Sequence, residues 1–250
     1  MERFSQDGIE WLEFDLLTDI PQVKHGVFLR LGGKSEGPFR GLNVSYDVGD
    51  DKTHVDANLK QIKDALKVPQ LVWGKQAHGK NISHVTPKSL NQNHTCDAFI
   101  SNLSNTALMV KHADCQAVIF YDPKNKAIAN IHVGWRGNVI NILEETIRHM
   151  QKTFGSNPAD LLVCISPSLG PDEAEFVNYS TELPEEFWTF QVRPTYFDLW
   201  AISEYQLQSA GILPHHIEIA RLSTYSNPHD YFSYRRDKIT GRHGTCVVLV

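Results

Sequence analysis

The chain has 250 residues, and the features that it lacks already narrow its interpretation. It has only four cysteines, which form no CxxC pair: Cys96, Cys115, Cys164 and Cys246. A chain of this length does not need a disulfide scaffold, so we expect reduced thiols. No apolar run approaches the roughly 18 residues of a membrane span, and no apolar signal segment follows the first residues. These absences predict a cytoplasmic protein without a membrane partner.

Clustered positive charge is also missing. The 24 Lys and Arg residues are outnumbered by 29 Asp and Glu residues, which gives a net charge of -5. The Arg235–Arg236 pair is the one basic cluster, whereas nucleic-acid binding requires several cations on one face. We therefore predict a small-molecule substrate and no nucleic-acid partner. An apolar content of 41% allows a sizeable core, and no repeat or linker divides the chain, so residues 1–250 are predicted to form one domain.

The most informative segment is Leu108–Gly137, which predicts two strands joined by a turn and then a sharp entry into a helix. Cys115 and His132 would lie on neighbouring strands, where thiol and imidazole can meet. Gly134 and Gly137 allow the backbone to pass close to whatever is bound there. A paired cysteine and histidine indicate a metal site or covalent chemistry. Taken alone, His78 is typical of a surface loop.

Periodic patterns predict the remaining elements. Apolar residues at helical spacing indicate a helix capped by Thr53, another capped by Asn138, and a third over Asp198–Ala210. Strands are expected at Val23–Leu31, Leu71–Trp73, Asn81–Val85, Asp97–Ile100, Leu161–Ile165 and Cys246–Val250. The N-terminus is interpreted as a polar leader, and Asp172–Glu186 as a solvated acidic surface. Asp97 is interpreted as a turn residue in preference to a hydrogen-bond acceptor that orients a metal ligand. The irregular alternation of helices and strands favours a mixed α/β sandwich over a doubly wound sheet.

Three motifs, taken in order, resemble the YfiH-type family, once labelled laccase-domain or multicopper polyphenol oxidase proteins. They are Gln76-Ala77-His78-Gly79, Ala113-Asp114-Cys115 and His132-Val133-Gly134-Trp135-Arg136-Gly137. The resemblance covers nearly the whole chain, including His25-Gly26, Leu42-Asn43, Gly49-Asp50-Asp51, Asp97-Ala98 and Thr240-Gly241-Arg242.

The resemblance implies an α+β, single-domain, four-layer αββα sandwich with mixed sheets, and zinc bound by His78, Cys115 and His132. It implies phosphorolysis of adenosine, inosine, guanosine and methylthioadenosine, together with deamination of adenosine. Two imidazoles and one thiolate leave the fourth position of tetrahedral zinc open, as catalytic sites do. The residues expected to hold phosphate or ribose are Arg30, Asn43, Arg136, Arg235 and Arg236.

The chain departs from the family pattern at several positions, which leaves the substrate preference open. These are Ser166, Asp172, Glu173, Ser203 and Ser223. The cytidine-deaminase signature, His-x-Glu followed by Pro-Cys-x-x-Cys, is missing, so deamination would use other machinery.

Three alternatives use the same residues. A laccase-like oxidase would bind several copper ions, but the chain contains no His-x-His pair of the kind a trinuclear centre demands. A Cys-His hydrolase acting on an amide of a cell-wall precursor would use Cys115 as nucleophile and a histidine as base. A structural metal site would need a fourth ligand, and His112, three residues before Cys115, is expected to point to the opposite face of the strand.

Overall fold

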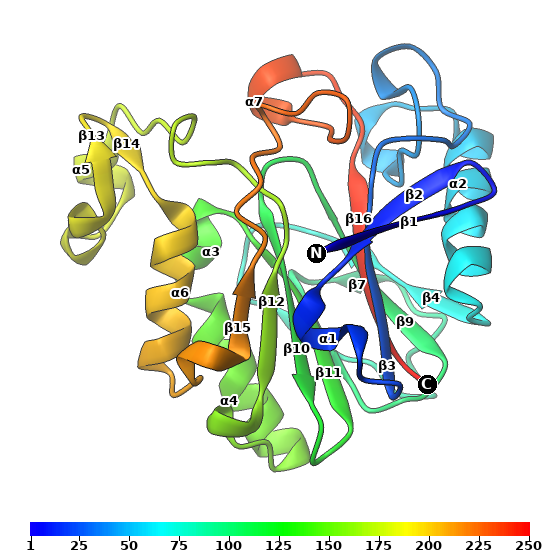
Figure 1. Cartoon of the computed structure of the whole chain (residues 1–250), viewed down its shortest axis with the longest axis horizontal. Coiled ribbons are helices and arrows are strands. Elements are labelled where there is room, and N and C mark those ends of the chain that lie inside the picture. Colours follow the sequence, from blue (N-terminus) through cyan, green and yellow to red (C-terminus); the bar gives the residue numbers. More distant parts are fainter.

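The computed structural model describes residues 1–250, which form two six-stranded β-sheets with helices on their outer sides (Figure 1). The strand order of the first sheet is β1 (Glu2–Gln6), β2 (Ile9–Glu13), β3 (Val23–Phe28), β16 (His243–Leu249), β9 (Thr106–His112) and β4 (Gln70–Val72). The order of the second is β15 (Ile217–Ile219), β12 (Leu162–Ile165), β10 (Gln116–Asp122), β11 (Ala127–Val133), β8 (Ala98–Ser101) and β6 (Ile82–His84). Each sheet contains parallel and antiparallel pairs, which confirms the predicted mixed α/β class.

The two sheets pack against each other through their central strands. Leu108 and Val247 of the first sheet meet Ile119 and Ile128 of the second in one buried cluster. Buried Asn130 of β11 donates hydrogen bonds to the Leu108 and Thr245 carbonyls, at 2.9 and 2.8 Å. Because buried N–H donors are costly to leave unpaired, this bridge favours one position of the two sheets relative to each other.

Helices cover the outward sides of both sheets. In α2 (Lys52–Leu66) the apolar stripe of Val55, Leu59 and Ile62 packs on the first sheet, and the helix begins at an Asp51 cap, so the predicted cap, Thr53, is wrong. In α4 (Ile142–Phe154) and α6 (Leu199–Ser209) apolar residues pack on the second sheet. None of the helices has the length and apolar character needed to cross a membrane.

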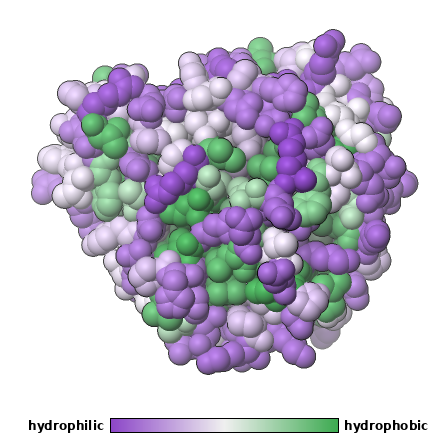
Figure 2. Space-filling view, in the orientation of Figure 1, coloured by the Kyte–Doolittle hydropathy of each residue, from purple (hydrophilic) through white to green (hydrophobic).

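The shorter elements complete the chain. They are α1 (Asp15–Thr18), α3 (Trp135–Val139), α5 (Tyr179–Glu182), α7 (Tyr234–Asp237) and two small sheets, β5 (Gly74–Lys75) with β7 (His94–Thr95) and β13 (Gln191–Arg193) with β14 (Tyr196–Phe197). The visible face is mostly hydrophilic, with hydrophobic side chains gathered toward its middle (Figure 2).

The strand predicted to continue from Leu108 through Cys115 is interrupted. β9 ends at His112 in the first sheet, and β10 begins at Gln116 in the second. The chain crosses between the sheets at Ala113–Cys115, where Asp114 has a φ of 92° that Asp tolerates better than most residues. An apolar pattern cannot reveal such a crossing, because strands of both sheets are buried on both faces. Cys115 is therefore the last residue of this bend, directly before β10.

Three other predictions were wrong. The polar leader forms β1 and β2, where Phe4 stacks on Trp11. The helix predicted to be capped by Asn138 is divided, because α3 ends at Val139 and Asn141 caps α4 from a left-handed conformation. The acidic segment Asp172–Glu186 is more than a solvated surface, since its Phe176 is buried in a small separate core with Phe187 and Phe197.

Candidate metal centre

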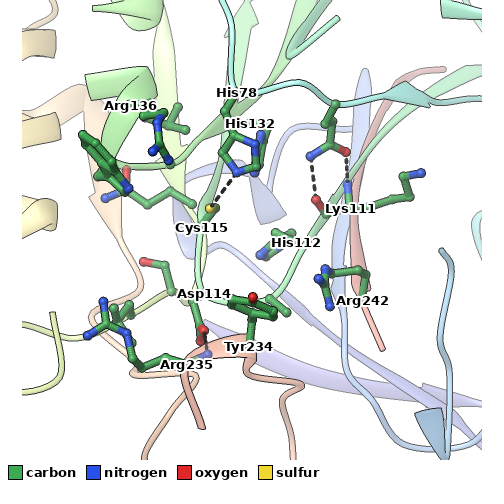
Figure 3. Close-up of a pocket in the computed structure, with 18 of the residues that line it drawn as sticks. His78, Lys111, His112, Asp114, Cys115, His132, Arg136, Tyr234, Arg235 and Arg242 are labelled. Carbon is green, nitrogen blue, oxygen red and sulfur yellow. Dashed lines mark hydrogen bonds between the residues drawn. The ribbon is translucent and has the colours of Figure 1, made fainter. Parts of the chain in front are cut away.

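His78, Cys115 and His132 come from three separate segments and converge on one point (Figure 3). Their donor atoms all lie within 4.8 Å of one another. The Cys115 Sγ lies 3.9 Å from the His78 Nε2, and the rings of His78 and His132 meet edge to face with centroids 4.8 Å apart. The antiparallel pairing of Gln116 with Val133 is what brings the Cys115 bend beside His132. His78 lies exposed on a loop, as predicted from its surroundings in the sequence, and its imidazole also lies beside Cys115 and His132, where the family resemblance places it.

Asp97 holds two members of this group in place. Its buried carboxylate accepts hydrogen bonds from the Nδ1 of His132 at 2.9 Å and from the backbone N–H of His78 at 2.9 Å. The N–H groups of Ala77 and Gly79 donate to its second oxygen. The carboxylate thus directs the Nε2 of His132 toward Cys115, in the way that a carboxylate bonded to the other ring nitrogen orients a metal-binding histidine. Asp97 therefore lies at a bend before β8 and is also the acceptor that was the alternative to a simple turn residue.

Gln76 anchors the same loop to the first sheet. Its side chain donates to the Lys111 carbonyl at 2.7 Å and accepts from the Lys111 N–H at 2.9 Å. This reciprocal pair replaces the ladder bonds that β9 lacks at its end. The His78 loop therefore has a fixed position relative to the strand that leads to Cys115.

The local charges favour a thiolate. Burial alone would raise the pKa of the Cys115 thiol, but the positive charge of His132 and hydrogen bonds from both histidines outweigh it and lower that pKa. Burial would lower the pKa of His132, but the Cys115 thiolate and the Asp97 carboxylate raise it. A thiolate is the form in which cysteine binds metals and acts as a nucleophile.

The donor set fits one zinc ion. Zinc takes nitrogen at about 2.0 Å and sulfur at about 2.3 Å, so tetrahedral ligand atoms are about 3.5 Å apart. The donor atoms lie within 4.8 Å of one another, and His78 is exposed, so its ring has room to adjust. His112 does not join them, because its Nε2 pairs with the Thr245 hydroxyl at 2.7 Å and its ring packs on His243. Three protein ligands leave one zinc position free, as in catalytic sites.

Gly134 gives these side chains their space, and we expect Gly134→Ala to weaken zinc binding about tenfold or more. A Cβ there would lie 2.9 Å from the Cys115 Sγ and 3.1 Å from the His78 Cδ2. The backbone of Gly134, with φ of -83° and ψ of 175°, accepts alanine, so the fold should persist. Gly137→Ala is the matched control, since its Cβ would make ordinary contacts of 3.4 and 3.5 Å. Competition titration against a zinc indicator measures both variants, and wild-type affinity in Gly134→Ala would contradict the site.

The three side chains open onto a cavity of about 1000 Å³. Its lining includes five basic residues, Lys111, Arg136, Arg235, Lys238 and Arg242, but only three acidic ones, Asp47, Asp114 and Glu175. Trp135 and Phe176 supply an aromatic wall, with ring centroids 5.9 Å apart. The cavity lining thus has an excess of positive charge, although the net charge of the whole chain is negative. Such a lining suits an anionic ligand.

Two of the five predicted phosphate or ribose ligands line the cavity. The Arg136 guanidinium stacks on the Trp135 ring at 4.1 Å and donates no hydrogen bond to the protein, so its donors are free. The Arg235 guanidinium also faces the cavity but donates to the Glu173 and Glu175 carbonyls.

The other three predicted ligands lie outside the cavity lining and stabilise loops around it. Arg30 donates to the Pro228 carbonyl, and Arg236 donates to the Thr224 and Tyr231 carbonyls. Asn43 is fully buried and bonds to Asp50 and Arg242. Each of them is bonded within the protein and none lines the cavity, so a residue type alone does not identify a ligand.

The family departures are satisfied within the protein. Ser203 donates to Gln116, and Ser166 accepts from the Ala117 N–H. Glu173 and Ser223 contact each other at 3.0 Å. The Asp172 carbonyl accepts from Arg193 at 2.6 Å. None of the departing residues lines the cavity.

Several residues that line the cavity have no distinctive signal in the sequence. Lys111 and Arg242 line the cavity, yet each is a single cation within an otherwise apolar or mixed segment. Phe176 reaches the cavity from a segment whose acidic composition concealed its small core.

The fold and site define a class of mixed α/β proteins in which two packed sheets carry a His-Cys-His group at a cationic cavity. A family model described as multi-copper polyphenol oxidoreductase laccase matches residues 24–250, so the chain belongs to that family. This confirms the resemblance that the motifs indicated.

Relatives and solved structures agree with this assignment. The chain is 30% identical over 244 residues to a protein of Bacteroides thetaiotaomicron named purine nucleoside phosphorylase, covering 90% of both chains. It is 31% identical over 232 residues to purine nucleoside phosphorylase YfiH of Escherichia coli, covering 88% of this chain and 91% of the relative. The crystal structure of the Bacillus licheniformis hypothetical protein YfiH superposes with a TM-score of 0.88 at 28% identity, covering 98% of this chain and 97% of that one.

Proposed function

We propose that the protein is a zinc-dependent purine nucleoside phosphorylase that cleaves adenosine, inosine, guanosine and methylthioadenosine with phosphate, and that it also deaminates adenosine. The observation that carries this proposal is the convergence of two imidazoles and one thiol beside a cationic cavity with an aromatic wall. The names of the relatives support the phosphorylase activity.

Each part of the cavity has a role in this reaction. The free donors of Arg136 match two phosphate oxygens, because a guanidinium binds phosphate in a bidentate manner. Trp135 and Phe176 offer flat apolar surface to the purine. Cavities of about 300–1000 Å³ accommodate molecules of drug size, so this one holds a nucleoside together with phosphate.

His78, Cys115 and His132 would hold the zinc, and Asp97 keeps the His132 Nδ1 proton so that its Nε2 remains a ligand. When bound there, zinc supplies Lewis acidity that polarises a substrate oxygen or lowers the pKa of water to about 7. One ion suits this set better than the several copper ions of an oxidase, because the chain brings only these three donors together.

We further propose the four-layer αββα description for the fold and a single domain over residues 1–250. The packing of α2 on one sheet and of α4 and α6 on the other supports it.

Purified protein is expected to contain about one zinc ion per chain, in line with a single three-ligand site. With phosphate, adenosine should yield adenine and ribose 1-phosphate, and without phosphate some inosine and ammonia should appear. Elemental analysis and chromatography of the reaction products measure both. Several copper ions without zinc, or no turnover of any purine nucleoside by zinc-loaded protein, would contradict the proposal. Oxidation of a phenol would favour the oxidase instead.

A further inference from the structure

A second cavity, of about 790 Å³, lies against the first, and the proposed reaction does not use it. The two cavities share Asp47 and Lys111 in their lining. Three further lysines line the second cavity, Lys60, Lys63 and Lys75, together with the aromatic residues Tyr46 and Trp73. One acidic residue there, Asp56, already accepts from the Tyr46 hydroxyl at 2.5 Å. The second cavity therefore has an excess of positive charge.

Lys111 stands at the junction of the two cavities. Its side chain is 7% exposed, and its one ion pair, at 3.3 Å, is with Asp47. The carboxylate of Asp47 is 64% exposed and lies on a short helical turn at the surface, Tyr46–Val48. A buried ammonium gains more from an anion than an exposed carboxylate loses by returning to water. An incoming anion can therefore displace Asp47.

Two cationic side chains lie on different sides of the triad formed by His78, Cys115 and His132. Figure 3 shows Arg136 on one side of His78, Cys115 and His132 and Lys111 on the other, with the Lys111 side chain directed away from the triad. The proposed function places inorganic phosphate at Arg136 and leaves Lys111 without a ligand group. A free nucleoside has no negatively charged group that could pair with Lys111.

We propose, on the basis of the proposed function, that Lys111 and the second cavity receive phosphate groups on the 5′ position of the substrate, so that nucleoside 5′-phosphates are substrates. The nucleoside lies in the first cavity, and its phosphate arm displaces Asp47 and enters the second. In phosphorolysis of a nucleoside 5′-monophosphate, the bond from C1′ to the purine nitrogen breaks and a phosphate oxygen bonds to C1′. The products are the free purine, which takes up a proton, and ribose 1,5-bisphosphate.

Calorimetry and turnover with inosine and inosine 5′-monophosphate test this proposal in the zinc-loaded protein. The wild type is expected to bind the nucleotide about tenfold more tightly than the nucleoside. Lys111→Met preserves the buried aliphatic stem and should abolish most of that preference. Asp47→Asn should increase the preference for the nucleotide, because the substitution frees the Lys111 ammonium from its ion pair. Lys152→Met, which removes an exposed lysine of α4 outside both cavities, should leave the preference intact.

Opposite effects of Lys111→Met and Asp47→Asn would indicate that Lys111 binds the phosphate group. If the two residues had only a structural role, both variants would bind both compounds more weakly and to the same extent. The proposal is overturned if the wild type binds inosine at least as tightly as its 5′-monophosphate, or if Lys111→Met weakens both equally. Turnover of inosine without any nucleotide preference would leave the phosphorylase function standing. If the nucleotide binds more tightly but neither compound is turned over, the phosphorylase function is contradicted, whereas phosphate binding at Lys111 is supported.

Discussion

Cys115→Ser protein is expected to lose most of its zinc and to turn over purine nucleosides more than about 100-fold more slowly than the wild type. A serine hydroxyl is a poor zinc ligand at neutral pH, and two imidazoles alone hold the ion weakly. His78→Ala and His132→Ala should have the same effect, because all three donor atoms converge on one point. The fold should survive, since a chain with two packed sheets does not depend on one metal ion.

Cys164→Ser is the control for this experiment. Cys164 is a free, fully buried thiol of β12 in the core between the sheets, so its replacement costs core packing but touches no ligand. Elemental analysis, turnover and thermal unfolding of the two variants separate loss of metal from loss of fold. Cys115→Ser protein that retains a full zinc complement while inactive would contradict the ligand assignment.

The same cysteine distinguishes the metal enzyme from a Cys-His hydrolase. If Cys115 binds zinc, the metal should slow its alkylation, and chelation should expose it. If Cys115 is a nucleophile, it should react fastest in the native enzyme, and a covalent substrate adduct should be trapped. Mass spectrometry of alkylated and substrate-treated protein distinguishes these results at the level of one residue.

The sequence predicted the elements that have strong local signals. The strand beginning at Val23, helix α2 and helix α6 lie where the apolar pattern indicated, although Asp198, predicted as the first residue of α6, is its N-cap. The meeting of Cys115 and His132 was also predictable, because two strands joined by the short turn at Asp122–Asn125 tend to pair. Each of these features depends on residues close together in the chain.

The features that were missed depend on residues far apart in the chain. The crossing at Asp114 is stabilised by the Thr224 hydroxyl and the Arg235 N–H, which donate to its carboxylate. The position of Lys111 between two cavities depends on segments that are distant in the sequence. The role of Asp97 depends on a loop about twenty residues earlier and a strand thirty-five residues later. No spacing within one segment encodes such partners, so only the assembled structure reveals them.

Asp97→Asn is expected to weaken zinc binding about 10- to 100-fold although Asp97 is not a ligand. The carboxylate accepts four hydrogen bonds, and an amide has only one oxygen. If the amide NH₂ faces His132, the Nδ1 must become the acceptor and the ring proton moves to Nε2, which then cannot bind metal. If the NH₂ faces Ala77 and Gly79, it opposes their N–H groups and displaces the loop that carries His78.

Asp97→Asn should also lower the free energy of unfolding by about 1–3 kcal/mol, because either orientation leaves buried donors unsatisfied. Asp230→Asn is the matched control: that carboxylate is buried, accepts from Arg3, Asn227 and His229, and lies outside the cavity lining. Both variants should be destabilised, but only Asp97→Asn should lose zinc affinity when folded protein is titrated with a competing chelator. Equal zinc affinity in the two variants would show that Asp97 stabilises the loop without orienting His132.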